Sequence, residues 1–134
     1  MFVDARAIIA VLSDEPEAGR VARALAAAAV RVTSPVAVLE AVMGLARADK
    51  FAISPAAVTP LVLEFLGLRD IEIRDLPPAP ETVALATAAA DRYGTGRRRL
   101  NLGDCLHYAC AKHQGMPILA TGDEFRRTDL ETIP

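Results

Sequence analysis

Tryptophan is absent from this chain, and tyrosine occurs only twice. Proteins that bind single-stranded nucleic acid without sequence preference stack bases on aromatic side chains, so a broad stacking platform is not expected, even if Tyr93 contacts a base. An excess of basic residues is also missing, since 15 Lys and Arg stand against 17 Asp and Glu and the formal net charge is −2. Composition therefore does not indicate a nucleic-acid-binding protein. The charge of the whole chain would not, however, reveal a local basic strip beside an acidic cluster.

Long apolar runs are lacking too, despite a hydrophobic content of 52%. A membrane-spanning helix needs about 18 consecutive apolar residues, and charges or prolines interrupt every candidate. The opening residues, MFVDARAIIAVL, have neither the basic segment nor the small-residue cleavage site of a secretory signal. We therefore expect a soluble, cytoplasmic protein that does not associate with a membrane.

Cysteine occurs only at Cys105 and Cys110. Their spacing on a predicted helix directs the two thiols to largely different faces, which prevents a disulfide between them. Neither has the Cys-x-x-Cys spacing, or a histidine on the same face, that a thiolate metal site needs. We expect both cysteines to be small buried hydrophobic residues.

Short apolar segments alternate with helical segments along the chain. Strands are predicted at residues 2–3, 30–33, 71–73 and 117–120, followed by a last short strand that includes Leu130. Helices are predicted at residues 7–12, 16–29, 35–49, 54–67, 81–93 and 102–112, and residues 94–99 form a basic loop. This alternation predicts an α/β fold with a parallel sheet covered on both faces. The length fits a single domain over residues 1–134.

The fourth predicted helix has two unusual features. Ser54-Pro55 and Thr59-Pro60 are competing starts, and Pro60 inside a running helix would remove a backbone hydrogen bond, so we expect a break or kink there. Residues 61–66 are hydrophobic nearly all round the helix, more than one covered face requires. Such extra apolar surface predicts a protein partner.

Three aspartates lie where predicted elements begin or end. Asp4 follows the first strand and Asp123 follows the fourth, and functional groups of open parallel sheets gather beyond the carboxyl ends of the strands. Asp104 lies in the first turn of its helix. Taken alone, Asp104 could simply complement the helix dipole, which contributes about 0.3–1 kcal/mol.

Glu40 is harder to explain as an ordinary surface residue. Its neighbours one helical turn away are all apolar: Val36, Ala37, Met43 and Gly44. This pattern predicts that the carboxylate projects from a face packed against the sheet. Burying an ionised carboxylate costs several kcal/mol, so it must be paired, protonated or bound to a cation. An ion pair with Arg6 or Arg47 would explain Glu40 alone, but not four acids together.

If the four acids converge, their mutual repulsion raises their pKa values unless a divalent cation lies among them. Oxygen ligands without His or Cys suit Mg²⁺ or Mn²⁺. Such a metal can polarise a phosphoryl oxygen and activate a water that attacks a phosphodiester. A Mg²⁺-dependent phosphoacceptor or phosphatase is an alternative, but many such sites need a second acid adjacent to the strand-end Asp or two positions after it. Ala5 and Arg6 supply neither.

Three segments, FVDARAIIAVL, SPVAVLEAV and LNLGDCLHYACAKHQGMPILATGDEFRRTDL, together resemble the PIN-domain ribonucleases, specifically the VapC toxins of bacterial toxin–antitoxin pairs. The resemblance covers nearly the whole chain, and the third segment is the most specific. It implies a PIN-like α/β/α sandwich with a central parallel sheet, a homodimer, and an antitoxin whose tail lies over the active-site groove. It also implies a Mg²⁺-dependent endoribonuclease that hydrolyses RNA phosphodiesters with a metal-activated water.

By motif, the metal-binding and catalytic quartet of that family maps onto Asp4, Glu40, Asp104 and Asp123. The resemblance implies that the three aspartates are the nearer ligands and that Glu40 acts through water. In two places the chain departs from the family pattern. Arg6 stands where Ser or Thr is common, and Glu124 stands beside Asp123 where Asp is frequent.

Several further residues have both a functional and an ordinary interpretation. Arg97, Arg98 and Arg99, with Arg126 and Arg127, flank the proposed site and could grip RNA phosphates together with Arg6, or could be solvated loop charges. Asn101 and Thr121 could orient the acids by hydrogen bonds, or could cap their own elements. His107 lies on the helical face of Asp104, where a proton-transfer role is conceivable. A structural histidine is the expected role, because metal–water hydrolysis in this family does not need one.

Arg6 generates the first testable prediction. Its guanidinium could grip substrate phosphate bidentately, or could occupy the acidic cluster and compete with the metal. We predict the second effect, so Arg6→Ser should tighten Mg²⁺ binding in a titration, and an unchanged or weaker affinity would contradict it. If Arg6 neutralises the cluster completely, the chain would be a catalytically weak module that binds RNA or antitoxin.

Overall fold

A computed structural model describes residues 1–97 and 99–133. The strands are β1 (Phe2–Val3), β2 (Arg31–Thr33), β3 (Ile71–Ile73), β4 (Ile118–Leu119) and β5 (Thr132–Ile133). The helices are α1 (Ala5–Leu12), α2 (Ala18–Ala27), α3 (Pro35–Ala46), α4 (Pro55–Leu68), α5 (Ala79–Tyr93) and α6 (Leu102–His113), followed by the short 3-10 helix η1 (Phe125–Arg127). The predicted substrate contact at Arg98 lies outside the described residues.

All strand pairs in the sheet are parallel, in the order β3-β2-β1-β4-β5. The chain builds the sheet outward from β1 to β3 and then returns to place β4 on the other side of β1. The strand order therefore reverses between β1 and β4. In open parallel sheets, ligands bind in the crevice outside the carboxyl ends of the strands at such a switch point. Asp4, which directly follows β1, lies at that position.

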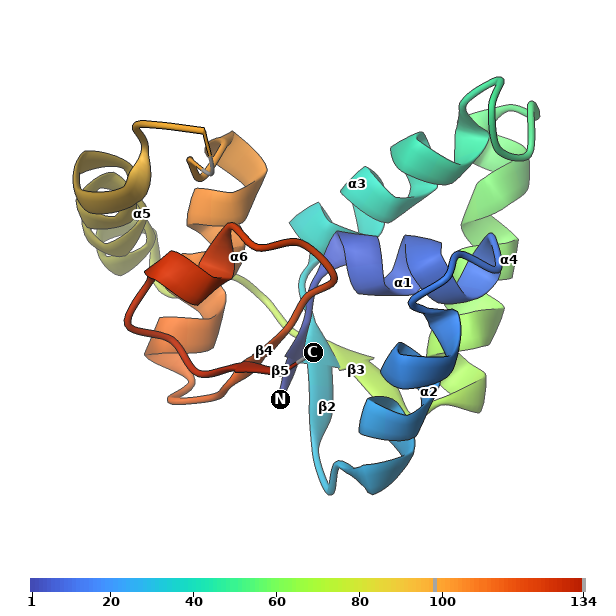
Figure 1. Cartoon of the computed structure of the whole chain (residues 1–134), viewed down its shortest axis with the longest axis horizontal. Coiled ribbons are helices and arrows are strands. Elements are labelled where there is room, and N and C mark those ends of the chain that lie inside the picture. The colour runs from blue at the N-terminus through green and yellow to red at the C-terminus, as the bar shows by residue number, and fades with distance from the viewer. Residues whose placement is uncertain (98, 134) are drawn as a thin grey trace.

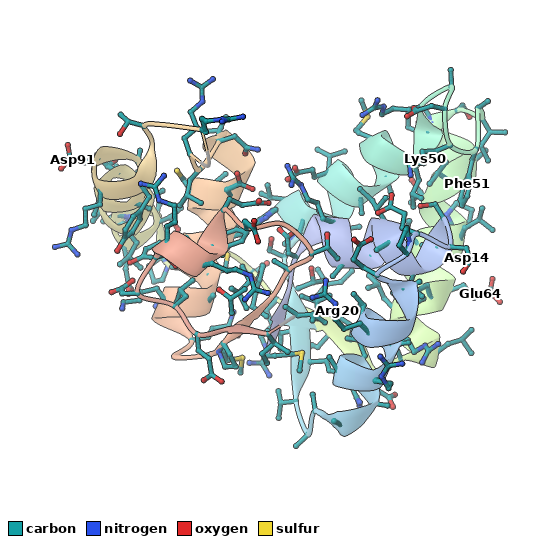
Figure 2. The ribbon with its side chains drawn as sticks, viewed as in Figure 1. Asp14, Arg20, Lys50, Phe51, Glu64 and Asp91 are labelled. Atoms are coloured by element: carbon teal, nitrogen blue, oxygen red, sulfur yellow. The ribbon has the colours of Figure 1, made fainter. Side chains whose placement is uncertain are left out.

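Helices cover both sides of the sheet, so the expected α/β/α architecture with a central parallel sheet is confirmed. Helices α5 and α6 lie on one side, whereas α1 to α4 gather on the other (Figure 1). Figure 2 places Asp91, on α5, at one end of the molecule and Glu64, on α4, at the opposite end. Helix α3 contacts α1 and α4 within its own group and also reaches α6.

The central strands β1, β2 and β4 are largely buried because helices cover them, as expected for a parallel sheet. Phe2, Val3, Val32, Ile118 and Leu119 are all 0% exposed. Cys105 and Cys110 are buried free thiols, which confirms the prediction for both. Among the described residues, no helix is long and apolar enough to cross a membrane.

Two predicted features of the regular elements are absent from the described residues: the break at Pro60 and a strand that includes Leu130. Helix α4 runs without a break through the exposed Pro60, because the side chain of Ser54 caps its first turn and buried Val58, Val62 and Phe65 hold the helix on the core. The packing of this buried face outweighs the one hydrogen bond that proline removes. The last strand begins at Thr132 and does not include Leu130.

Candidate metal centre

Asp4 is held in place by both the sheet and α1. Its backbone N–H donates to the carbonyl of Leu119 at the end of β4, over 3.0 Å. As the N-cap of α1, its Oδ2 accepts the backbone N–H of Arg6 at 3.0 Å. The residue is only 2% exposed. This carboxylate therefore has a defined orientation at the switch point of the sheet.

Asp104 enters the same crevice from α6. It forms a capping box with Asn101: the backbone N–H of Asn101 donates to Asp104 Oδ2 at 2.8 Å, and Asn101 Oδ1 accepts the backbone N–H of Asp104 at 2.9 Å. Asp104 is 4% exposed. The side chain of Asn101 therefore caps the helix, and a separate bond from its backbone N–H holds the Asp104 carboxylate. The cap uses only one of the two carboxylate oxygens.

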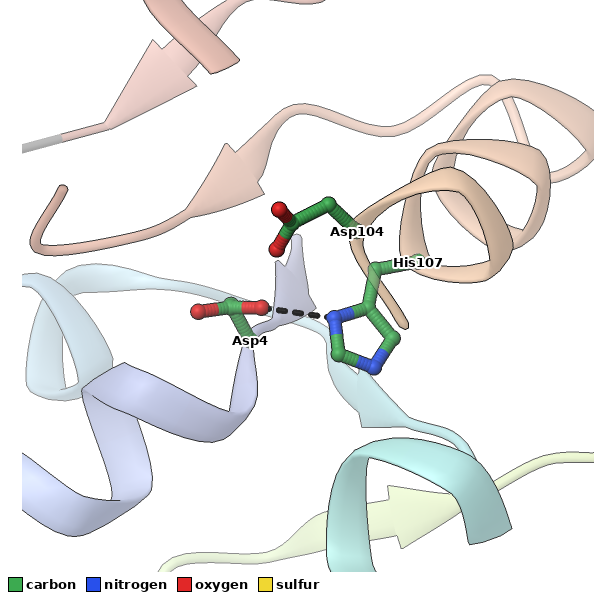
Figure 3. Close-up of side chains that lie close together, drawn as sticks. All are labelled: Asp4, Asp104 and His107. Atoms are coloured by element: carbon green, nitrogen blue, oxygen red, sulfur yellow. Dashed lines mark hydrogen bonds and ion pairs between the residues drawn. The ribbon is translucent and has the colours of Figure 1, made fainter. Parts of the chain in front are cut away.

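His107 lies one turn further along α6 and is fully buried. Its Nδ1 lies 2.7 Å from Asp4 Oδ1, and its Nε2 lies 3.5 Å from Glu40 Oε2. Figure 3 shows Asp4 and Asp104 approaching each other from α1 and α6, with the imidazole beside Asp4. Each of Asp4, Asp104 and His107 offers a ligand atom within 4.8 Å of the other two.

Glu40 reaches this cluster from α3, but not in the way its apolar neighbours predict. Its side chain is 37% exposed and Met43, one turn away, is 53% exposed, so the predicted packing of this face on the sheet is wrong. Helix α3 makes its main contacts with other helices and turns Glu40 toward the start of α6. A Cβ atom at Gly103 would lie only 2.5 Å from Glu40 Oε2. Glycine at this position therefore makes room for the carboxylate.

The expected alternative of an ion pair between Glu40 and an arginine does not match the observed pairs. Arg47 pairs with Asp49 at 3.1 Å, and Arg6 Nη1 lies 2.9 Å from Glu124 Oε1. The titratable group beside Glu40 is instead the imidazole of His107.

The two acids after β4 have opposite environments. Asp123 is exposed, and its Oδ1 lies 3.4 Å from Arg126 Nε, so Asp123 is outside the group formed by Asp4, Asp104 and His107. Glu124 is buried, and its carboxylate folds back over Gly122 toward Arg6. In the sequence, Glu124 stands out only because it departs from the family pattern. Two adjacent acids in a loop carry no periodic signal that tells which one turns inward.

The electrostatics of the cluster follow from this burial. Burial raises the pKa of Asp104 to about 6; the backbone hydrogen bond from Asn101 opposes the shift, while the charges of Asp4 and Glu124 add to it and that of Arg6 opposes it. Burial lowers the pKa of His107, but the hydrogen bond to Asp4 and the nearby carboxylates outweigh this effect and raise it. Without a cation, the raised pKa values of Asp104 and His107 favour the protonated forms of both groups.

These features fit a divalent cation. Two buried carboxylates from different elements converge, each with one oxygen fixed by a backbone N–H donor. The raised pKa of Asp104, caused first by burial and then by the charges of Asp4 and Glu124, indicates that its ionised form is not fully compensated by the protein. An oxygen-rich donor set suits a hard cation.

The remaining predicted residues surround the cluster. Arg97 and Arg99 are exposed in the loop that leads into α6. Thr121 lines a cavity of about 420 Å³ beside Arg6, Gly44, Arg47 and Lys50. A substrate role for these arginines, and an orienting role for Thr121, remain predictions.

Comparison with known proteins places this geometry in context. The model of the PIN domain family matches residues 1–131. The chain is 34% identical to Ribonuclease VapC30 of Mycobacterium tuberculosis over 146 aligned residues, covering 99% of this chain and 98% of the relative.

Solved structures show the same fold at lower identity. The crystal structure of Mycobacterium tuberculosis VapC20, described as a Sarcin-Ricin loop cleaving toxin, superposes with a TM-score of 0.74 at 20% identity and covers 99% of this chain and 98% of that one. VapBC-1 from nontypeable Haemophilus influenzae gives a TM-score of 0.68 at 18% identity, with 98% and 94% coverage.

The raised pKa of Asp104 predicts that the free energy of unfolding of the metal-free protein depends on pH. Between pH 3.8 and about 6 the folded chain keeps a proton on Asp104 that the unfolded chain has lost, so stability falls as pH rises through this window. Asp104→Asn cannot ionise. In EDTA, the free energy of unfolding of wild type relative to Asp104→Asn should fall by up to about 1.4 kcal/mol per pH unit there, measured by urea denaturation. A difference that is independent of pH would contradict the assignment.

Gly103→Ala should disturb the site without unfolding the protein. The new Cβ displaces the end of the flexible Glu40 side chain, while alanine improves helix propensity by about 1 kcal/mol. We expect equal or higher stability with weaker metal binding, measured by calorimetric titration. Gly67→Ala is the matched control, because a Cβ there meets no atom within 4 Å. Equal metal affinity in the two variants would show that the position of Glu40 does not matter.

Proposed function

Because this chain belongs to the PIN-domain family, alongside the VapC ribonucleases, we propose that it is a metal-dependent endoribonuclease that hydrolyses RNA phosphodiester bonds. The observation that carries the proposal is the convergence of the buried Asp4 and Asp104 carboxylates at the switch point of the sheet. We infer that the cation is Mg²⁺ or Mn²⁺, since carboxylate oxygens suit these ions.

Asp4 and Asp104 would hold the cation, and the backbone N–H groups of Arg6 and Asn101 keep their carboxylates oriented toward it. A divalent cation in such a site polarises a phosphoryl oxygen and lowers the pKa of a bound water. Glu40, which is partly exposed at the edge of the crevice, would act through a water. Asp123 would complete the quartet from the exposed rim, close to the incoming substrate.

RNA would reach the site across a basic rim. The exposed Arg97 and Arg99 lie just before α6. Arginine binds phosphate oxygens bidentately, so these side chains would position the RNA backbone without reading its sequence.

We further propose that the chain is the toxin of a toxin–antitoxin pair, with a cognate antitoxin protein as partner and a second copy of itself in a homodimer. The VapBC-1 structure supports the first partner. Exposed apolar side chains on α4, at Leu61, Leu63 and Leu68, supply surface for protein contacts. A ribonuclease controlled in this way would act in the cytoplasm, where its RNA lies.

The test is cleavage of a small-RNA pool by the purified, antitoxin-free chain in Mg²⁺ or Mn²⁺. EDTA and Asp104→Asn are the controls, since Asn keeps an oxygen for the capping bond to Asn101. We expect cutting that both controls abolish, with products that end in 5′-phosphate and 3′-hydroxyl. Products with a 2′,3′-cyclic phosphate would contradict hydrolysis by a metal-activated water. A folded wild type that binds RNA but cuts none would favour the binding module, in which Arg6 neutralises the cluster.

A further inference from the structure

His107 is a polar side chain in a place where an apolar one would fill the space. It is 0% exposed, and its ring lies against Phe2 with the two ring centroids 5.9 Å apart. Its Nε2 is buried and has no hydrogen-bond partner among the described residues. An unpaired buried polar atom costs free energy that a leucine here would avoid. Packing alone therefore does not account for histidine at this position.

The contacts of the imidazole join two of the acids. The carboxylate of Asp4 can only accept, so we assign the proton to Nδ1, which then donates to Asp4 Oδ1 over 2.7 Å. The backbone N–H of Arg6 donates to the other oxygen, Asp4 Oδ2. Both oxygens of Asp4 are thereby held, and the plane of its carboxylate cannot turn freely. The opposite edge of the ring faces Glu40 Oε2 at 3.5 Å.

We propose that His107 is a positioning residue for the metal site, which orients the Asp4 carboxylate and sets the distance of Glu40 from it. This inference rests on the proposed function and adds a residue to it. His107 is not itself a ligand, because Nδ1 is engaged with Asp4 and Nε2 is directed at Glu40. Hydrogen-bond partners of ligating groups typically change metal affinity 10–100-fold when they are removed.

Two variants of His107 separate positioning from packing. His107→Leu removes both polar contacts and keeps an apolar filler. His107→Asn places an amide donor near the position of Nδ1, so it keeps the bond to Asp4 but has no group that faces Glu40. Mn²⁺ affinity is measured by calorimetric titration without RNA, and stability by urea denaturation in EDTA. We expect His107→Leu to stay folded and to bind Mn²⁺ about 10–100-fold more weakly, and His107→Asn to recover most of the affinity. Asp104→Asn, titrated alongside, shows whether the metal site itself exists.

The outcomes distinguish the two proposals. If wild type and Asp104→Asn bind Mn²⁺ equally, the proposed metal site is wrong. If Asp104→Asn abolishes binding but His107→Leu leaves it unchanged, only the role of His107 is wrong. If His107→Asn binds as poorly as His107→Leu, the bond to Asp4 is not what matters, and the inference is overturned.

A measurement on wild type keeps the inference testable if His107→Leu does not fold. Nitrogen-15 NMR reports which imidazole nitrogen is protonated, and the exposed His113 is an internal control as the only other histidine. We expect His107 to carry a proton on Nδ1 and its ring signals to shift on addition of Mg²⁺, while those of His113 stay in place. A His107 with bare Nδ1, or one whose signals do not respond to Mg²⁺, overturns the inference.

Discussion

Electrostatic repulsion between two carboxylates, withdrawn from water and brought together, is the constraint on which this site depends. Asp4 and Asp104 are both nearly fully buried, and burial together with neighbouring charge raises the pKa of Asp104 to about 6. Such an arrangement costs folding free energy unless positive charge enters it. The fold thus keeps two acids together in a buried site that a bound divalent cation would stabilise.

The local structure offsets part of this repulsion. Asp4 caps the amino end of α1, and Asp104 lies in the first turn of α6. The partial positive charge at a helix amino end stabilises a nearby anion. The parallel sheet brings these two helix ends together, because α1 follows β1 directly and the next strand beside it, β4, follows α6. The sheet topology and the capping bonds therefore contribute to the same site.

Much of this arrangement could be predicted from local sequence, because it is encoded locally. Asp4 after a two-residue apolar segment and Asn101 three residues before Asp104 are patterns of strand ends and helix caps, and the structure has both. Glu40 was predicted to face the sheet, but periodicity shows only which residues share a helical face and not what covers it. Helix α3 directs that face toward α6, and Gly103 leaves the space that the carboxylate occupies.

Residues whose role depends on distant parts of the chain could not be predicted in this way. The contact between His107 and Asp4 spans 103 positions, and its pattern alone did not separate a structural histidine from one that holds an acid. The inward turn of Glu124, and the outward one of Asp123, depend on how Gly122 and the buried Phe125 direct the loop after β4. The unbroken helix at Pro60 likewise reflects packing of its buried face, which outweighs local propensity.

Diffraction at the manganese absorption edge, from crystals soaked in Mn²⁺, tests the central claim most directly. The account predicts one anomalous peak within about 2.5 Å of an oxygen of Asp4 and of an oxygen of Asp104, with both nitrogens of His107 outside bonding distance. A peak on Asp123 alone, or none between Asp4 and Asp104 in crystals where the crevice is open to solvent, would contradict it.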